Sequence, residues 1–311
     1  MQRKNEHQSV LMNEVLEVLN IKADGIYFDG TFGRGGHAGA ILERLGPEGR
    51  LLAMDKDPDA IAFARKKFES ESRFEIRQGS FAMMTEVVEE LGLVQQIDGI
   101  LLDLGVSSPQ IDNADRGFSF MKDGPLDMRM DTSQGQSAAQ WLACAELEEI
   151  SNVIRDFGEE RFHFRIARAI VEYRQTNTLS TTLQLANLIE KTVPKREKGK
   201  HPATRSFQAI RIYINHELDD LKAGLEQSVS VLKVGGRLAV ISFHSLEDRL
   251  VKRFFRQKVE GKRLPFDLPV QNEETGAELR LVGRALRPGA AEVDSNVRAR
   301  SSSLRVAEKI T

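Results

Sequence analysis

Apolar residues along the first 110 positions alternate between short continuous runs and helical spacing. The continuous runs are typical of buried strands, and the segments between them carry apolar side chains every three or four residues. The strand-like runs lie in "GIYFD", "RLLAMD", "RFEIRQGSF" and "IDGILLDLGVSS". Strands that alternate with helices predict an α/β fold with a parallel, doubly wound sheet, whose ligands bind outside the carboxyl ends of the strands.

This alternation stops at Ser107. From there to about Arg205 no segment has a strand pattern, and a Gly/Asp/Met-rich loop, "DRGFSFMKDGPLDMRMD", precedes several helical segments. Crossover loops usually run about 2–6 residues, so this interruption predicts an inserted helical subdomain over residues 110–205. The sheet domain is then discontinuous, with residues 1–109 and 206–311.

The chain returns to the sheet after the insertion. A long helical stretch, "SFQAIRIYINHELDDLKAGLEQSVSVL", leads to a turn at "KVGG" and to a fifth buried strand in "RLAVISFHS". Two further segments, "ELRLVGRAL" and "SSSLRVAEK", read as short strands on either side of a Gly/Pro loop.

Composition is that of an ordinary globular protein. The chain has 311 residues, of which 41% are hydrophobic, and no apolar run has the length of a membrane span. Because the N-terminus also lacks a signal-peptide core, we expect a cytoplasmic protein with no membrane partner. The single cysteine, Cys144, and six scattered histidines provide no metal-ligand spacing, so we expect neither a bound metal nor redox chemistry.

The net charge of −2 hides an uneven distribution. Residues 1–110 carry 12 basic and 18 acidic side chains, whereas residues 195–256 carry 13 basic and 7 acidic ones. This bias favours contact of the later segment with nucleic acid, although exposed helices with solvated basic faces would give the same count. The candidate phosphate contacts are Lys195, Arg196, Lys198, Lys200, Arg205 and Arg211.

Aromatic residues supply candidates for base stacking. Phe118 and Phe120 flank the entry to the predicted insertion. Phe207, Ile210 and Ile214 recur at helical spacing, which favours a place in the core.

The stretch "YFDGTFGRGGHAG" fits two glycine signatures. From Gly33, "GRGGHA" fits the G-x-G-x-x-A pattern that holds a dinucleotide pyrophosphate. From Asp29, "DGTFGRGG" fits D-x-T-x-G-x-G, a variant of the glycine loop of S-adenosylmethionine (SAM) methyltransferases. Both readings give Asp55, 20 positions after Gly35, the role of accepting hydrogen bonds from ribose hydroxyls. The loop alone therefore leaves the cofactor open.

The later part of the chain resembles class I SAM methyltransferases, in which a Gly-Gly turn precedes the fifth strand and an antiparallel pair ends the sheet. Four blocks in order, "DGTFGRGGH", "LLDLGVSSPQ" with "DRGFSFMKDGPLDMRM", "HPATRSFQAIRIYIN" and "ISFHSLEDRLVK", resemble the bacterial RsmH (MraW) family. The resemblance covers essentially the whole chain. It implies a class I Rossmann-like fold, SAM as cofactor, and N4-methylation of a cytosine in the decoding (P-site) region of 16S rRNA, within the small ribosomal subunit.

The same resemblance implies a set of cofactor contacts. The family's "GGH" lines the cofactor site, an aromatic covers the adenine, and the acid ending the fourth strand contacts the cofactor. Many methyltransferases place an acid after the third strand to bind the adenine amine, but here that position reads "QGSF". Asp29 is expected to hold the glycine loop in shape. For the aromatic, Phe81, the alternative to covering the adenine is a position in the core. The implied contacts are Gly35, Gly36, His37, Asp55, Phe81, Asp103 and Gln110.

No catalytic group is assigned. "SSP" occupies the place of a D/N/S-P-P-aromatic motif of amino-methyltransferases, but the second proline and the aromatic are missing, so Ser107 and Ser108 are only weak candidates. C5-methylation of cytosine needs a cysteine nucleophile, and Cys144 lies in a helical pattern of the insertion. Two other classes fit parts of the chain: a non-catalytic RNA-binding module and an NAD-dependent Rossmann enzyme. A homodimer is one option for its assembly.

Overall fold

The computed structural model describes residues 9–194, 199, 201–261 and 276–311. The chain forms two compact units, of which the first comprises Met1–Gly105 and Asp219–Thr311 and the second Val106–Leu218. The predicted insertion covered residues 110–205, and the second unit extends further because helix α10 (Thr204–Ile214) packs against α7 (Leu147–Gly158) within it.

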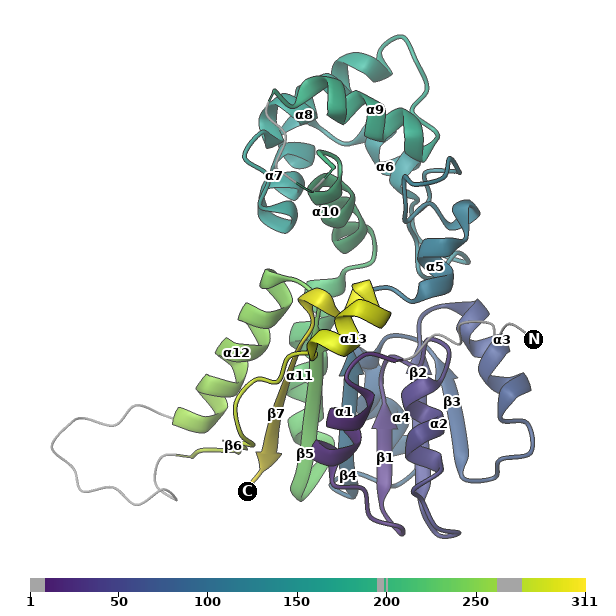
Figure 1. Cartoon of the computed structure of the whole chain (residues 1–311), viewed down its shortest axis with the longest axis vertical. Helices are drawn as coiled ribbons and strands as arrows, with labels where there is room; N and C mark the ends of the chain where they lie inside the picture. Colours follow the sequence, from purple (N-terminus) through teal and green to yellow (C-terminus); the bar gives the residue numbers. More distant parts are fainter. Residues whose placement is uncertain (1–8, 195–198, 200, 262–275) are drawn as a thin grey trace, which may run out of the picture. The chain divides into compact units, whose positions relative to one another are not determined.

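The first unit is built on a seven-stranded sheet with the order β3-β2-β1-β4-β5-β7-β6 (Figure 1). Strands β1 to β5 pair in parallel, and β7 runs antiparallel to both β5 and β6. This arrangement confirms the class I methyltransferase fold with its terminal antiparallel pair. The strands are β1 (Ile26–Asp29), β2 (Arg50–Asp55), β3 (Phe74–Gln78), β4 (Ile97–Asp103), β5 (Leu232–Ser242), β6 (Leu279–Leu281) and β7 (Ser303–Lys309).

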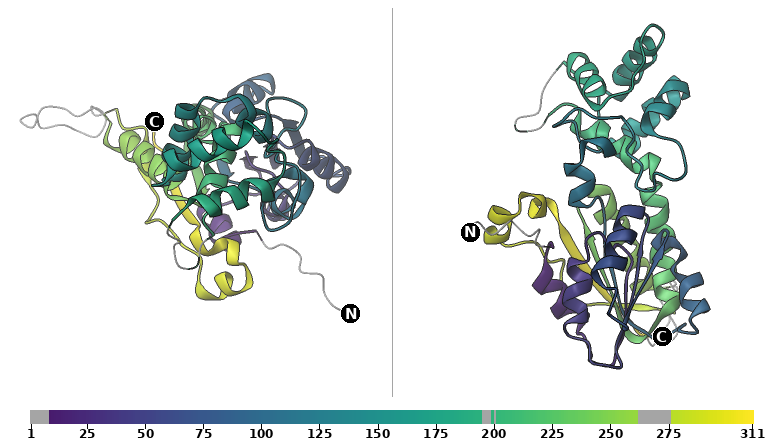
Figure 2. Two further views of the ribbon diagram at one scale, coloured as in Figure 1. Left: turned by 90° about the horizontal axis from the view of Figure 1, so that it is seen from above. Right: turned by 90° about the vertical axis from the view of Figure 1, so that its right-hand side faces the viewer.

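Helices cover both faces of this sheet (Figures 1 and 2). Side chains alternate along each strand, so that Phe28 packs into a core with α4, α11 and α12, while its neighbour Tyr27 packs into a second core with α1, α2 and α3. The helices are α1 (Met12–Leu19), α2 (Gly36–Leu42), α3 (Pro58–Lys67), α4 (Met84–Glu90), α11 (Glu217–Val231), α12 (Ser245–Glu260) and α13 (Ala290–Ser295).

Strand β5 differs from its prediction. The sequence placed a turn at "KVGG", but the strand continues through these residues, with Gly235 at φ +80°. Its pairing with β4 shifts register between Ile97 and Gly99. Glycine adopts this left-handed conformation without a Cβ clash, so the chain bends inside the strand and pairing resumes after the bend.

The second unit is helical, as predicted, and its described residues form only an isolated bridge between Pro125 and Thr181 in place of a strand. Its core gathers Trp141, Ile154, Ile170 and other apolar side chains. The helices are α5 (Ser108–Asp112), α6 (Ala138–Cys144), α7, α8 (His163–Arg174), α9 (Thr182–Thr192) and α10.

The long helical stretch predicted before β5 is two helices. α10 ends at Ile214, Asn215 caps it, and His216 has φ +53° before α11 begins at Glu217. A left-handed residue cannot continue an α-helix, so the chain turns here. None of the described helices has the length and apolar character needed to cross a membrane.

Candidate active site

The glycine loop joins β1 to α2 at the carboxyl end of the sheet. Gly33 and Gly35 have φ values of +55° and +64°, and Gly35 caps α2. A Cβ built on Gly35 would lie 2.6 Å from Phe32 Cε2, so only glycine fits there. Lys67 Nζ donates to the carbonyl oxygens of Arg34 and Gly35 at 3.2 and 3.1 Å, which fixes the outer side of the loop.

Asp55 ends β2 and holds this loop. Its Oδ2 accepts a hydrogen bond from the Gly33 N–H at 2.7 Å, and its Oδ1 accepts one from the Asp57 N–H at 2.8 Å. Asp57 itself caps α3 by accepting from the Asp59 N–H. The structure therefore brings the predicted ribose acceptor against the glycine loop, and it distinguishes Asp55 from the two nearby acids, which belong to the start of a helix.

The buried His37 and the partly buried Asp103 form a pair beside the loop. His37 Nε2 lies 3.6 Å from Asp103 Oδ2, and the side chains are 5% and 24% exposed. Thr31 Oγ1 accepts from the Asp103 N–H at 2.6 Å, which joins the end of β4 to the loop after β1. Within the described residues, the buried Asp103 Oδ1 has no hydrogen-bond partner, whereas the His37 ring interacts with Asp103 and with the backbone of Val10.

A third ionisable group, Asp29, lies at the end of β1. It is 1% exposed and accepts a hydrogen bond from the Thr31 N–H at 3.0 Å. Burial raises the pKa of Asp29 to about 7, against the opposing effect of His37. Burial lowers the pKa of His37, but the neighbouring Asp103 and Asp29 outweigh it, so this pKa lies above its ordinary value. The cluster therefore favours a cationic His37 between carboxyl groups.

Phe81 follows β3 at the same end of the sheet. Its side chain is half-buried at the edge of the core formed with α4, α11 and α12. A Cβ on Gly30 would lie 2.8 Å from Phe81 Cβ, and one on Gly224 would lie 2.7 Å from Phe81 Cε2. Two glycines thus make room for the ring. Part of the ring packs in the core, in agreement with the alternative, and the role of Phe81 toward an adenine stays a prediction.

Gln110 and the weak catalytic candidates belong to the second unit. Ser107 caps α5, and its N–H donates to Gln110 Oε1 at 2.9 Å. Gln110 is buried, and Ser108 begins the helix. The structure places these residues within their own unit only, so their roles toward the cofactor or substrate stay predictions.

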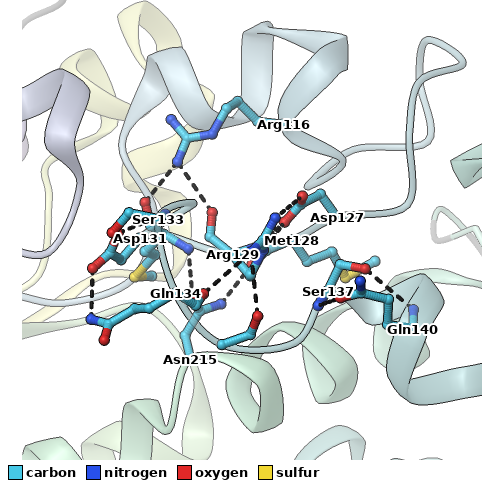
Figure 3. A network of polar contacts seen from close by, with 12 residues as sticks. Arg116, Asp127, Met128, Arg129, Asp131, Ser133, Gln134, Ser137, Gln140 and Asn215 are labelled. Atoms are coloured by element: carbon cyan, nitrogen blue, oxygen red, sulfur yellow. Dashed lines mark hydrogen bonds and ion pairs between the residues drawn. The ribbon is translucent and has the colours of Figure 1, made fainter.

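A polar network orders the loop before α6 (Figure 3). Asn215 Oδ1 accepts from the Met130 N–H at 2.7 Å, and its Nδ2 donates to the Met128 carbonyl at 2.7 Å. Arg116 Nη2 donates to the carbonyls of Arg129 and Met130 at 3.1 and 2.8 Å. The blocks "DRGFSFMKDGPLDMRM" and "HPATRSFQAIRIYIN", far apart in sequence, therefore meet through Asn215.

The same loop contains a bidentate ion pair (Figure 3). Arg129 donates to both oxygens of Asp127 at 2.8 Å. Burial raises the pKa of Asp127, but its hydrogen bonds with Arg129 prevail and leave this pKa below its ordinary value. Sequence reasoning had assigned no role to Asn215 or to this pair, although both lie in the blocks that carry the resemblance.

Several predicted RNA contacts are engaged within the second unit. Phe120 packs against His201 and Phe207 with centroid distances of 4.6 and 4.8 Å, and Phe207 is buried as predicted. Arg211 donates to both oxygens of Glu217 at 2.8 Å. Arg205 donates to the Glu159 carbonyl at 3.0 Å. The core assignments of Ile210 and the part-buried Ile214 are also confirmed. The guanidinium of Arg116 lies over the ring of Phe118, with Cζ 5.9 Å from the ring centroid. The remaining candidates lie outside the described residues: Lys195, Arg196, Lys198 and Lys200.

The block "ISFHSLEDRLVK" passes from β5 into α12. Asp248 in this block accepts two hydrogen bonds from Arg305 of β7, at 2.8 and 3.0 Å. These bonds hold the pKa of Asp248 below its ordinary value. The pair fixes α12 to the reversed strand that completes the sheet.

A doubly wound sheet with an inserted reversed strand, and a glycine loop facing acids at the ends of β2 and β4, defines a class I methyltransferase. The chain belongs to the MraW methylase family, whose model matches residues 4–310. It is 60% identical over 305 residues to the ribosomal RNA small subunit methyltransferase H of Thioalkalivibrio sulfidiphilus, covering 98% of this chain and 97% of that protein. The protein of the same name from Nitrosococcus oceani is 56% identical over 308 residues, covering 99% and 98%.

This membership confirms the resemblance and decides between the two readings of the glycine loop. The cofactor of this methyltransferase family is SAM. The residues present fit it, because the loop leaves no side chain at Gly35 or Gly36 and because Asp103 Oδ1 is a buried polar atom without a partner in the described part of the chain. Asp55 adds a carboxylate at the end of β2 for a ribose.

Proposed function

We propose that the protein transfers a methyl group from SAM to the exocyclic N4 amine of a cytosine in the decoding (P-site) region of 16S rRNA. The observation that carries the proposal is the His37–Asp103 pair beside the glycine loop, because the buried Asp103 Oδ1 has no hydrogen-bond partner in the described residues and calls for a polar ligand. The names of the relatives point to rRNA of the small subunit. The cytosine and its N4 atom rest on the resemblance of the four sequence blocks.

The residues of the first unit bind and orient the cofactor. Asp55 accepts from the ribose hydroxyls, and Gly35 and Gly36 allow close approach of the backbone. Asp103 offers Oδ1 as an acceptor, and His37 Nδ1 completes the polar wall. SAM supplies an activated methyl group when bound. Gln110 is proposed to close the pocket, and Phe81 to cover the adenine with the part of its ring outside the core.

The second requirement is a nucleophilic amine. The lone pair of cytosine N4 is delocalised into the ring, so acceptors for its hydrogens are needed to favour tetrahedral geometry at nitrogen. Ser107, Ser108 or a backbone carbonyl near them are proposed to supply these acceptors, because they follow Asp103 directly in the chain. Holding the reacting atoms in line at about 3–3.5 Å then provides most of the rate enhancement.

The position of Cys144 argues against C5-methylation. That reaction needs a thiolate that attacks the pyrimidine ring. Cys144 ends α6 as an exposed residue, and its Sγ donates to the Gln140 carbonyl at 3.4 Å. A reactive thiolate usually has a histidine or lysine as partner, but the contacts described for Cys144 are with Gln136, Gln140 and Trp141. Amine methylation needs no such nucleophile.

Radiolabelled methyl transfer tests the proposal. Purified protein is incubated with labelled SAM and either free 16S rRNA, small ribosomal subunits or 23S rRNA as control. We expect label in a 16S substrate, none in 23S rRNA, and loss of transfer in Asp103→Ala. Absence of label from both 16S substrates under conditions where SAM binds would refute the proposed function.

A further inference from the structure

Three polar side chains from distant parts of the chain meet at the carboxyl ends of β2 and β3. Ser80 Oγ donates to Asp220 Oδ2 at 2.5 Å, and the Lys56 ammonium forms an ion pair with the same oxygen. Ser80 Oγ also accepts from the Ala82 N–H at 3.1 Å. Lys56 follows Asp55 and Ser80 precedes Phe81, whereas Asp220 belongs to α11. We call these three residues the Asp220 cluster.

The cluster lies beside the proposed cofactor residues. Asp220 is one helical turn before Gly224, whose missing side chain makes room for the Phe81 ring. Its two partners immediately adjoin Asp55 and Phe81 in the chain. A carboxylate thus lies at the part of the site between the proposed ribose acceptor and the proposed adenine cover.

The carboxylate of Asp220 keeps an acceptor for a ligand. Both contacts described above use Oδ2, so Oδ1 takes part in neither of them. The side chain is 19% exposed, so it is held in place and still reaches solvent. Ser80 is less suited to bind a ligand, because its hydroxyl proton goes to Asp220 and its oxygen accepts from Ala82.

Adenine presents an amine donor on the edge that base pairing uses. A carboxylate accepts such a donor well, and a half-exposed aromatic ring next to it offers a surface for the base. The end of β3 itself, "QGSF", provides no acid. We propose that Asp220 accepts a hydrogen bond from the exocyclic amine of the SAM adenine, and that Lys56 and Ser80 position its carboxylate. The proposal rests on the proposed function, because it needs SAM in this site.

The test compares two ligands that differ at the edge that carries this amine. S-adenosylhomocysteine carries the amine, and S-inosylhomocysteine has a carbonyl oxygen in its place and a proton on the neighbouring ring nitrogen. Calorimetric titration of the wild-type protein should give a clear preference for the adenosine compound, since a site that hydrogen-bonds an amine rejects the analogue without it. Asp220→Asn, which keeps the shape but loses the charge, should bind S-adenosylhomocysteine about 10- to 100-fold more weakly and lose most of the preference.

Two further variants keep the test decisive. Ser80→Ala removes one of the two partners of Asp220 and should lower the preference less than Asp220→Asn. It also serves as the test variant if Asp220→Asn does not fold. Asp219→Asn is the matched control, because Asp219 is 73% exposed and pairs with Lys222 on the outer side of the same helix, so its preference should equal that of the wild type.

The outcomes separate the two proposals. Wild-type discrimination retained in Asp220→Asn and in Ser80→Ala would overturn the role of Asp220 while leaving the SAM site intact. Failure of the wild-type protein to bind S-adenosylhomocysteine at all would overturn the SAM site, and the role of Asp220 with it. A loss of affinity for both ligands at constant ratio would assign the cluster a purely structural role and would also overturn the proposal.

Discussion

The backbone N–H of Gly33 donates to Asp55 Oδ2 at 2.7 Å, so the carboxylate that ends β2 also shapes the loop after β1. Replacing Asp55 therefore removes two contributions: the proposed acceptor for the ribose and the support of the glycine loop. We expect Asp55→Ala to weaken SAM binding by about 1.5–3 kcal/mol, the range for hydrogen bonds to a charged group.

Calorimetry with SAM measures this change. Asp59→Asn is the control, because Asp59 is an exposed acid only four positions further along, in the first turn of α3, and its replacement should leave the affinity unchanged. Equal affinities of Asp55→Ala and wild type would remove Asp55 from the site.

The buried Asp29 gives the free energy of unfolding a specific dependence on pH. Its pKa rises from 3.8 to about 7 in the folded protein, so the folded state binds the proton more tightly. Stability is therefore highest below about pH 4 for this group and falls as the pH rises to about 7. His37, whose folded pKa is also raised, acts in the same direction, because its contribution is lost as the pH rises through that pKa.

Asp29→Asn imitates the protonated form and should flatten this part of the profile. The free energy of unfolding is measured with urea at pH 4 and at pH 8. The difference between variant and wild type should shift in favour of the variant by on the order of 2–4 kcal/mol from pH 4 to pH 8. Asp24→Asn, at an exposed position, is the control. Parallel pH profiles of Asp29→Asn and wild type would show that Asp29 does not carry the effect.

Asn215 links two loop segments of the second unit, so its removal should destabilise that unit. Asn215→Ala leaves the Met130 N–H and the Met128 carbonyl without their side-chain partner, whereas the Arg211 carbonyl keeps the backbone N–H of residue 215. We expect a loss of roughly 2 kcal/mol or more in the free energy of unfolding, because buried groups are left unsatisfied. Methyl transfer to RNA should fall further than SAM affinity.

Chemical denaturation and SAM titration of the same variant check this expectation. Asn177→Ala is the matched control, since Asn177 is exposed just after α8 and its side chain donates to the neighbouring Tyr173 carbonyl and Thr176 hydroxyl. A variant at Asn215 as stable as the Asn177 control would mean that the network does not order the loop.

We propose that the basic side chains of residues 195–256 bind RNA phosphates. Lys198 and Lys200 lie outside the described residues. Arg205 lies in the first turn of α10, and its guanidinium donates to the Glu159 carbonyl. Neutralising these three residues together should lower RNA affinity and flatten its salt dependence, by about 0.7–0.9 in the slope of log K against log salt for each lost contact.

Filter binding over a series of salt concentrations measures this slope. Neutralising Arg65 and Lys66, which are exposed near the end of α3, provides a control that removes two positive charges from the first unit, against three in the test variant. A slope unchanged by the triple variant would assign the segment to a solvated basic face, as the alternative reading of the charge distribution has it.

Much of the sheet could be predicted because buried parallel strands give continuous apolar runs in the sequence. The helices between them give apolar residues with a period near 3.6. The bend in β5 could not be predicted, since "KVGG" is typical of a turn, and only the pairing of Leu232 and Arg237 on either side of it with β4 makes it a bend within one strand. Nor could the break between α10 and α11, where a non-glycine residue, His216, has a positive φ. At both the bend in β5 and the break between α10 and α11, tertiary contacts outweigh the local sequence preference.

For the site, topology predicted which strand ends meet, but not how the side chains pair. The position of Asp55 near the glycine loop follows from the βα units, whereas the resemblance implied His37 and Asp103 as separate cofactor contacts and did not pair them. The Asp220 cluster had no signal in the sequence, because Ser80 and Asp220 are 140 positions apart and Asp220 reads as a polar residue on an amphipathic helix. Such a contact depends on how α11 packs against the sheet.

The identity of the methylated nucleoside tests the central claim most directly. Small-subunit rRNA modified by the wild type and by Cys144→Ala is digested to nucleosides and compared by mass spectrometry with authentic N4-methyl, C5-methyl and 2′-O-methyl cytidine. Our account predicts N4-methylcytidine from both proteins in similar yield, because Cys144 is an exposed residue at the end of α6 and amine methylation needs no thiolate. A C5-methyl or 2′-O-methyl product, or loss of activity in Cys144→Ala, would contradict it.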